Sequence, residues 1–231
     1  VSDNGSIYAK YSTGYRAGGA NDRSQTFTAF NPEAVKAYEI GAKMDILDRR
    51  LRTNLAAYMM DRQDTQIDFD NVDTTPGSPT QGAHTEETRN APGTSKIKGL
   101  EADFTALISQ DLMAGFSYAY TDVKIPSAPF PFTGNAVVPK GTPFPVNVVY
   151  TPPTAWSYFL DYFVPVGDLS LHTHIDANYA DATQTFDQTP VTNDKSFLVN
   201  ARFSFADLKL GRGGSMSFAL WARNLLDEAY V

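Results

Sequence analysis

Three polar residues in one short stretch have side chains that can bind metal ions. His172, His174 and Asp176 are each separated by a single residue. In an extended strand, residues two apart point to the same face, so both imidazoles and the carboxylate would lie together. Two histidines and a carboxylate suit Zn²⁺ or iron, although the spacing of about 7 Å between alternate residues stretches chelation. The alternative interpretation is a hydrated stripe along a polar strand face.

Glu101 and Asp103 share a face in the same way and have the side-chain types of a general acid and base. A solvated wall explains them more simply. The sequence has no cysteine for a thiolate nucleophile. It also contains no phosphate-binding loop, no dinucleotide-binding glycine motif, and neither a G-x-S-x-G nor an H-E-x-x-H motif. We therefore expect a protein that is not an enzyme and that needs no cofactor.

The composition excludes several other classes. The 231 residues carry a formal net charge of −7, which argues against a nucleic-acid partner. A hydrophobic fraction of 42% is too high for a disordered chain. No apolar run reaches the ~18 residues of a transmembrane helix, and no secretory signal opens the chain. Aromatic residues make up 13% of a chain whose mean hydropathy is only −0.31, as alternation of apolar and polar residues would produce.

Alternation with a period of two recurs along the whole sequence and predicts about nine long strands. Each run approaches the ~9–11 residues that a tilted strand needs to cross a bilayer. One face of each run is apolar or aromatic, and the other carries charged and polar residues. The runs are 7–16, 37–46, 51–63, 99–108, 112–121, 156–164, 169–179, 197–205 and 216–223.

The connections between these runs alternate strictly between long and short. Loops above ~12–15 residues are uncommon in compact soluble domains, whereas a transmembrane barrel has short turns on one side and long loops on the other. We therefore predict an all-β, antiparallel, up-and-down transmembrane β-barrel segment. A soluble β-sandwich with its apolar faces in a core is the alternative. The long connections are 17–34, 64–96, 125–153 and 181–195, and the short ones are 47–51, 109–112, 164–169 and 206–215.

In such a barrel the apolar faces would meet outer-membrane lipid, and the polar faces would line a lumen. Aromatic residues near strand ends would form a girdle, with the ring in the acyl chains and the polar group in water. The predicted girdle residues are Tyr15, Tyr58, Tyr118, Tyr120, Trp156, Tyr162 and Tyr179. The predicted lumen residues are Glu39, Lys43, Glu101, Asp103 and Arg202.

Four motifs, in order and well separated, resemble those of TonB-dependent outer-membrane receptors. The first pairs a strand with a Gly-Tyr-Arg-x-Gly-Gly loop entry, and the second has the form P-E-x-x-x-x-x-E-x-G-x-K. The third combines Asn-Ala with Gly-Leu-Glu, and the last has the form R-N-L-x-D-x-x-Y. They occupy residues 5–19, 31–33 with 38–43, 90–93 with 98–101, and 222–230.

This resemblance implies a roughly 22-stranded barrel with a plugged lumen. An odd strand count does not close such a barrel, so residues 1–231 would be the C-terminal part of the barrel. The plug domain, the early strands and the last strand would then lie outside this chain.

The resemblance also implies active uptake of a scarce nutrient across the outer membrane of a Gram-negative bacterium. The implied partner is TonB, acting through the missing N-terminal plug region. A ferric siderophore is the expected ligand, and vitamin B12, haem and saccharides remain open. From their inward parity near the loop ends, Arg16, Arg62, Asp176 and Asn178 are the predicted ligand contacts. A passive porin-like channel and a soluble β-sandwich carbohydrate-binding domain are the alternative functions.

Overall fold

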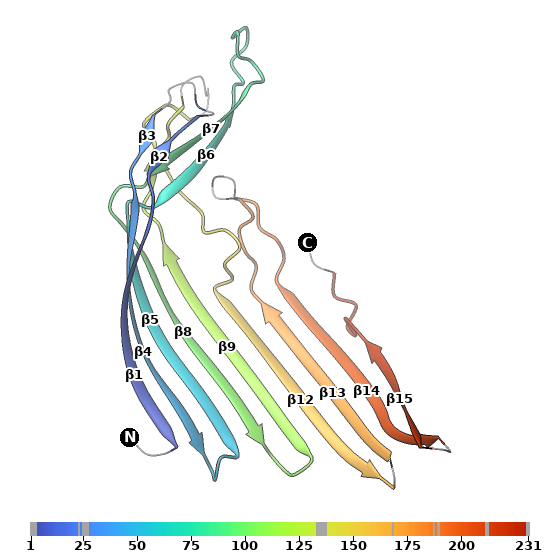
Figure 1. Cartoon of the computed structure of the whole chain (residues 1–231). Helices are drawn as coiled ribbons and strands as arrows, with labels where there is room; N and C mark the ends of the chain where they lie inside the picture. Colours follow the sequence, from blue (N-terminus) through green and yellow to red (C-terminus); the bar gives the residue numbers. More distant parts are fainter. Residues whose placement is uncertain are drawn as a thin grey trace.

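The large sheet of this protein is a single layer of antiparallel strands, joined in chain order (Figure 1). The computed structural model describes residues 4–22, 24, 28–132, 138–167, 169–186, 188, 190–210 and 213–229. Tyr230, the last residue of the R-N-L motif, lies outside this range. In the described part of the chain, no helix is long and apolar enough to cross a membrane.

Nine strands form this sheet within the described residues, and each pairs antiparallel with its sequence neighbours in the sheet. The predicted strand order is therefore confirmed. Several strands extend past the predicted ends, because their polar loop-proximal residues continue the hydrogen-bond ladder. The strands are β1 (Gly5–Arg16), β4 (Glu33–Ile46), β5 (Leu51–Gln63), β8 (Thr94–Leu107), β9 (Leu112–Lys124), β12 (Thr154–Val166), β13 (Leu169–Ala180), β14 (Ser196–Leu210) and β15 (Gly214–Ala222).

Short turns and long loops lie at opposite ends of the sheet, as the sequence predicts (Figure 1). The turn between β4 and β5 uses three consecutive left-handed residues, Leu47, Asp48 and Arg49. Positive φ is costly for such residues, but Arg50 fastens this turn to the next one by donating from Nε to the carbonyl of Leu107 at 3.0 Å.

The alternation places apolar side chains on one face of the sheet and polar side chains on the other; we call these the apolar face and the polar face. Directly paired residues share a face, as Ile7 does with Ala42 and Lys10 with Glu39. Large apolar side chains on the apolar face are exposed, with Ile7 at 77%. The nine-stranded sheet thus does not bury its apolar face as a β-sandwich would.

The register confirms the apolar face for six of the seven predicted girdle residues and corrects the seventh. Tyr58 pairs with Glu39 and Gly99, so it lies on the polar face. Its hydroxyl is 2.9 Å from Oγ1 of Thr121. The prediction is wrong here because Tyr58 packs across a glycine on the polar face. Among the other six, Trp156 stacks on Tyr179 with ring centroids 5.5 Å apart.

Glycines beneath aromatic rings recur on the polar face. A Cβ at Gly99 would overlap the ring of Tyr58, and one at Gly115 would overlap the ring of Phe159. Gly41 is covered in the same way by Tyr8, whose hydroxyl donates to Oε1 of Glu39 at 2.7 Å. These glycines give the rings a flat surface to lie on and so stiffen the sheet across its strands.

The long loops contain short strand pairs that the sequence pattern did not reveal. The longest pair stands well above the large sheet (Figure 1). These strands are only two to seven residues long, which is too short for a period-two pattern to identify them. The pairs are β2 (Gly19–Ala20) with β3 (Ala29–Phe30), β6 (Gln66–Val72) with β7 (His84–Asn90), and β10 (Ala128–Pro129) with β11 (Pro143–Phe144).

The buried apolar core of the described chain lies among these loops rather than in the large sheet. We call it the loop core. Phe69 of β6 is only 1% exposed and meets Phe130 edge-on, with centroids 6.2 Å apart. Phe144 and Val146 pack against its edge. The members of the loop core are Ile67, Phe69, Ala91, Ala128, Phe130 and Phe132.

Candidate functional site

The two histidines of the predicted metal set meet at one carboxylate on the polar face. His174 lies opposite Asp161 in the β12–β13 register, and His172 lies two residues along, opposite Phe163. Oδ1 of Asp161 is 2.8 Å from Nε2 of His172 and 2.8 Å from Nδ1 of His174. The carboxylate thus accepts a hydrogen bond from each imidazole when both facing nitrogens carry protons.

Aromatic rings fix the orientation of both imidazoles. Phe163 stacks on His172 with ring centroids 4.1 Å apart and planes at 10°. Phe159 stacks on His174 at 6.3 Å and 20°. The rings therefore hold the nitrogens toward Asp161.

Asp176, the third member of the predicted set, shares the polar face with the two histidines, as expected. Its Oδ1 is 3.5 Å from Nε2 of His174. Within the described residues, no three groups of the ligand types are placed together as a metal site. Metal binding by His172, His174 and Asp176 thus stays a prediction.

Amide side chains surround Asp176 near the long-loop end of the sheet. Its Oδ2 accepts hydrogen bonds from Nδ2 of Asn178 and Nδ2 of Asn200, both at 2.8 Å. Oδ1 of Asn200 in turn accepts from the backbone N–H of Asn224 at 3.0 Å. Asn224 closes the turn after β15, because its side chain bonds both the N–H and the carbonyl of Glu228. The predicted residues Asp176 and Asn178 therefore belong to a polar ladder that runs across β13 and β14 to the turn after β15.

Arg62, another predicted ligand contact, is engaged by a buried glutamate. Its Nε and Nη2 donate to Oε1 of Glu33 at 3.0 and 2.6 Å. The other oxygen of Glu33 accepts from the backbone N–H of Gln66 at 2.8 Å. Arg62 thereby anchors the base of two long loops. Arg16 is exposed and lies opposite Glu33 in the register. Ligand contact by Arg16 or Arg62 stays a prediction.

Hydrogen bonds join the long loops to each other. Asn21 of the first loop pairs with the main chain of Thr88 in the second, with Nδ2 donating to the carbonyl at 3.0 Å and Oδ1 accepting from the N–H at 2.7 Å. Gln188 of the fourth loop accepts from the N–H of Asp70 at 3.0 Å. The third and fourth loops meet where the N–H of Tyr150 donates to the carbonyl of Gln184 at 3.0 Å. The loops therefore form one connected layer above the sheet.

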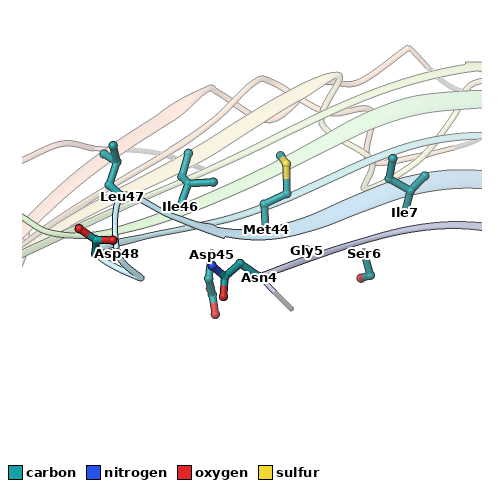
Figure 2. A pocket seen from close by; sticks show the side chains of 9 residues that line it. All are labelled: Asn4, Gly5, Ser6, Ile7, Met44, Asp45, Ile46, Leu47 and Asp48. Atoms are coloured by element: carbon teal, nitrogen blue, oxygen red, sulfur yellow. The ribbon is translucent and has the colours of Figure 1, made fainter. Parts of the chain in front are cut away.

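A hollow of about 630 Å³ lies at the short-turn end of β1 and β4. Figure 2 shows Ile7, Met44 and Ile46 pointing to one side of the strands, Asp45 pointing to the other, and Asp48 beside Leu47. Asp45 is paired with Arg52 at 2.9 Å. None of the predicted site residues lines this hollow.

Sequence reasoning missed three residues that organise the polar face: Asp161, Glu33 and Asn200. Parity placed Asp161 on the correct face, but its contact with the histidines depends on the β12–β13 register. Glu33 was part of a recognised motif, and only its burial shows that it anchors a loop. Asn200 carried no signal beyond its parity.

The comparisons with known proteins agree with this architecture. The family model described as "TonB dependent receptor-like, beta-barrel" matches residues 1–225. The Probable TonB-dependent siderophore receptor PiuA of Acinetobacter baumannii is 30% identical over 131 residues, covering 53% of this chain and 16% of that protein. The Metal-pseudopaline receptor CntO of Pseudomonas aeruginosa is 25% identical over 119 residues, covering 52% of this chain and 15% of that protein. This chain thus spans only a small part of these relatives.

A solved structure shows the same fold. The crystal structure of the siderophore receptor PiuA from Acinetobacter baumannii aligns with 99% of this chain and 30% of its own, with a TM-score of 0.65 and 22% identity. The nine-stranded sheet therefore has the geometry of a section of such a barrel. Its open edges, β1 and β15, correspond to positions where a barrel has further strands.

Proposed function

The chain belongs to the TonB-dependent receptor-like β-barrel family, and we propose from this that it forms the C-terminal part of the barrel of an outer-membrane active transporter. The transporter takes up a scarce metal chelate, with a ferric siderophore as the leading class. The observation that carries the proposal is the family match over residues 1–225, together with a single-layer sheet whose apolar face is exposed.

Physical chemistry supports a membrane location for this sheet. Burying apolar surface in acyl chains is worth about 25 cal/mol per Å² relative to water. Side chains such as Ile7 at 77% exposure and Leu220 at 63% would gain this energy in lipid. The outer membrane of a Gram-negative bacterium is the proposed location, with the long loops outside the cell.

The polar face would then line the lumen. Charged residues such as Glu39 and Arg202 are tolerated there because water and opposing side chains solvate them. A plug domain and the TonB contact belong to parts of the protein outside this chain. TonB, acting through that region, is the proposed energy-coupling partner.

The ligand class rests on the names of the relatives, one a siderophore receptor and the other a receptor for metal-pseudopaline. The connected loop layer and the polar ladder at the long-loop end are where such a ligand would first be held. Asp176, Asn178, Arg16 and Arg62 stay our proposed contacts in that region. Any metal ion enters as cargo within its chelate.

Uptake of ⁵⁵Fe by living cells tests the proposal. A strain lacking the gene is compared with the same strain carrying it, in the presence and absence of functional TonB. The panel consists of ⁵⁵Fe complexes of desferrioxamine B, 2,3-dihydroxybenzoate and citrate. We expect at least one complex to accumulate only when both the gene and TonB are present. Equal uptake of every complex in all strains would contradict the proposal.

The porin-like alternative gives a different result. A passive channel admits solutes without TonB and conducts steadily in a planar bilayer. The purified full-length protein should instead show little steady conductance, because a plug fills the lumen. Large, stable conductance would favour the passive channel.

A further inference from the structure

Two arginines on the polar face, in β14 and just after β15, have no acidic partner among the residues that the structure describes. Arg202 lies in β14, and Arg223 follows directly after β15. Within the part of the chain that the structure describes, neither guanidinium has a carboxylate within ion-pair distance. Arg52 and Arg62, by contrast, are each paired to a carboxylate on the same face.

Trp221 joins the two arginines. It lies directly opposite Arg202 in the β14–β15 register. The guanidinium carbon of Arg223 lies 5.2 Å from the centroid of the Trp221 ring. A guanidinium held over an indole keeps its N–H groups available for an anion while the ring stabilises its charge. Trp221 thus limits the motion of Arg223 without using its hydrogen-bond donors.

These side chains line a hollow of about 510 Å³, which we call the arginine site. Asp176, Asn200 and His174 also line it. Both oxygens of Asp176 already have partners, since Oδ2 accepts from two asparagines and Oδ1 faces His174. Two arginines against one aspartate leave a net formal charge of +1 when His174 is neutral. This positive hollow stands out in a chain whose net charge is −7.

We propose that the arginine site binds the carboxylate groups of an anionic small molecule inside the lumen. A planar guanidinium presents paired N–H donors that match a carboxylate in bidentate geometry. Two such donors on neighbouring strands suit a molecule with more than one acid group. The inference deepens the proposed function and rests on it, because it assumes that this face lines the solute path.

The test measures binding of citrate to the purified full-length receptor in detergent, by isothermal titration calorimetry. Citrate is the probe because it carries three carboxylates, and its uncharged triethyl ester is the matched control ligand. We expect citrate to bind and the ester not to bind. R202Q and R223Q should each weaken citrate binding about tenfold, the loss expected for one charged hydrogen-bonding group. R52Q, which removes an arginine from the far end of the same face, should leave the affinity within about twofold.

The conservative variants R202K and R223K keep the charge and lose the bidentate geometry. They should bind citrate with affinity between those of the wild type and the glutamine variants. Wild-type protein that fails to bind citrate overturns the proposal, as does equal affinity in R202Q, R223Q and R52Q. All variants are first checked for the heat-modifiable mobility of a folded barrel.

A second arm examines whether the arginines instead pair with acidic side chains of the receptor outside this chain. In that case R202Q and R223Q would expose new protease sites in the unliganded receptor without changing citrate affinity, and the proposal would be wrong. Binding is measured without TonB or transport. Equal ⁵⁵Fe uptake in all strains would therefore contradict the proposed function, while unchanged citrate binding in R202Q and R223Q would contradict the arginine site alone.

Discussion

Asn21 holds Thr88 through both of its amide atoms, as a neighbouring strand would hold it. The side-chain Nδ2 donates to the Thr88 carbonyl at 3.0 Å, and Oδ1 accepts from the Thr88 N–H at 2.7 Å. Asn21 is only 7% exposed. The pair fastens the first long loop to β7, the second strand of the tallest hairpin.

Replacing Asn21 should release this hairpin locally. N21A removes both bonds, each worth about 0.5–1.5 kcal/mol, so the Thr88 amide should exchange its hydrogen about tenfold faster. N21D keeps the acceptor and loses the donor to the carbonyl, and should be intermediate. Hydrogen–deuterium exchange with mass spectrometry of residues 84–90 checks this. N147A is the control, because the Asn147 amide makes a single 3.5 Å hydrogen bond to the described residues. Equal exchange of the Thr88 amide in N21A and N147A would contradict the proposed role of the Asn21–Thr88 hydrogen bonds.

Adding a methyl group under a polar-face aromatic ring should destabilise the barrel. G99A and G115A place a Cβ where the rings of Tyr58 and Phe159 lie. Overpacking of this kind costs about 1–3 kcal/mol. The matched control is G5A, whose Cβ would meet ordinary contacts at 3.4 Å from Lys43 and Met44. The unfolding temperature of the detergent-solubilised protein, read by the heat-modifiable gel shift, should fall for G99A and G115A and stay unchanged for G5A.

Truncating the centre of the loop core should loosen the loops and leave the sheet intact. Phe130 is 4% exposed and touches Phe69, Phe132 and Phe144. F130A should cost about 3 kcal/mol, as Phe→Ala changes in packed cores do. Proteinase K added to intact cells should cut the loops of F130A faster, while the gel shift of the barrel stays unchanged. Y150A is the control, since Tyr150 is 70% exposed. Loss of the gel shift in F130A would show that the loops and the sheet unfold together.

The tip of the β6–β7 hairpin should loosen in acid. The backbone N–H of Thr75 and the hydroxyls of Ser78 and Thr80 hold the pKa of Asp73 well below its ordinary 3.8. A carboxyl whose pKa is lowered by folding stabilises the fold above its unfolded pKa. That stabilisation is lost as the pH falls below 3.8 toward the folded value.

A spin label on T74C reports this change, and the chain offers no competing cysteine. Label mobility should rise between about pH 5 and about pH 2.5 in the otherwise wild-type protein. With D73N added, mobility should be higher at pH 5 and nearly independent of pH. A label that stays equally rigid across the range in both proteins would contradict the role of Asp73.

The large sheet could be predicted from the sequence because its strands obey one simple rule. Apolar groups that face lipid do not share a face with solvated charges, so alternation fixes the face of the residues from Ile7 to Leu220. The strand order then follows from short turns between antiparallel neighbours. Tyr58 broke the rule, because an aromatic ring is also stable on the polar face when a glycine lies beneath it.

The loops could not be predicted in this way. Phe69 and Phe130 are 61 positions apart in sequence, and no periodic pattern relates the segments that carry them. The contacts of Asp161 with His172 and His174 similarly required the register of a hairpin, which parity alone leaves undetermined. Two motif glycines, Gly41 and Gly99, gain a physical reason only once Tyr8 and Tyr58 are seen above them.

The loop core also determines how another molecule meets this protein from outside. Segments from the second and third loops contribute adjoining parts of one folded surface around Phe69 and Phe130. An antibody raised against a single loop peptide would therefore be directed at a shape that the intact protein does not display. A binder selected on whole cells would recognise a discontinuous epitope, and would lose it on denatured blots.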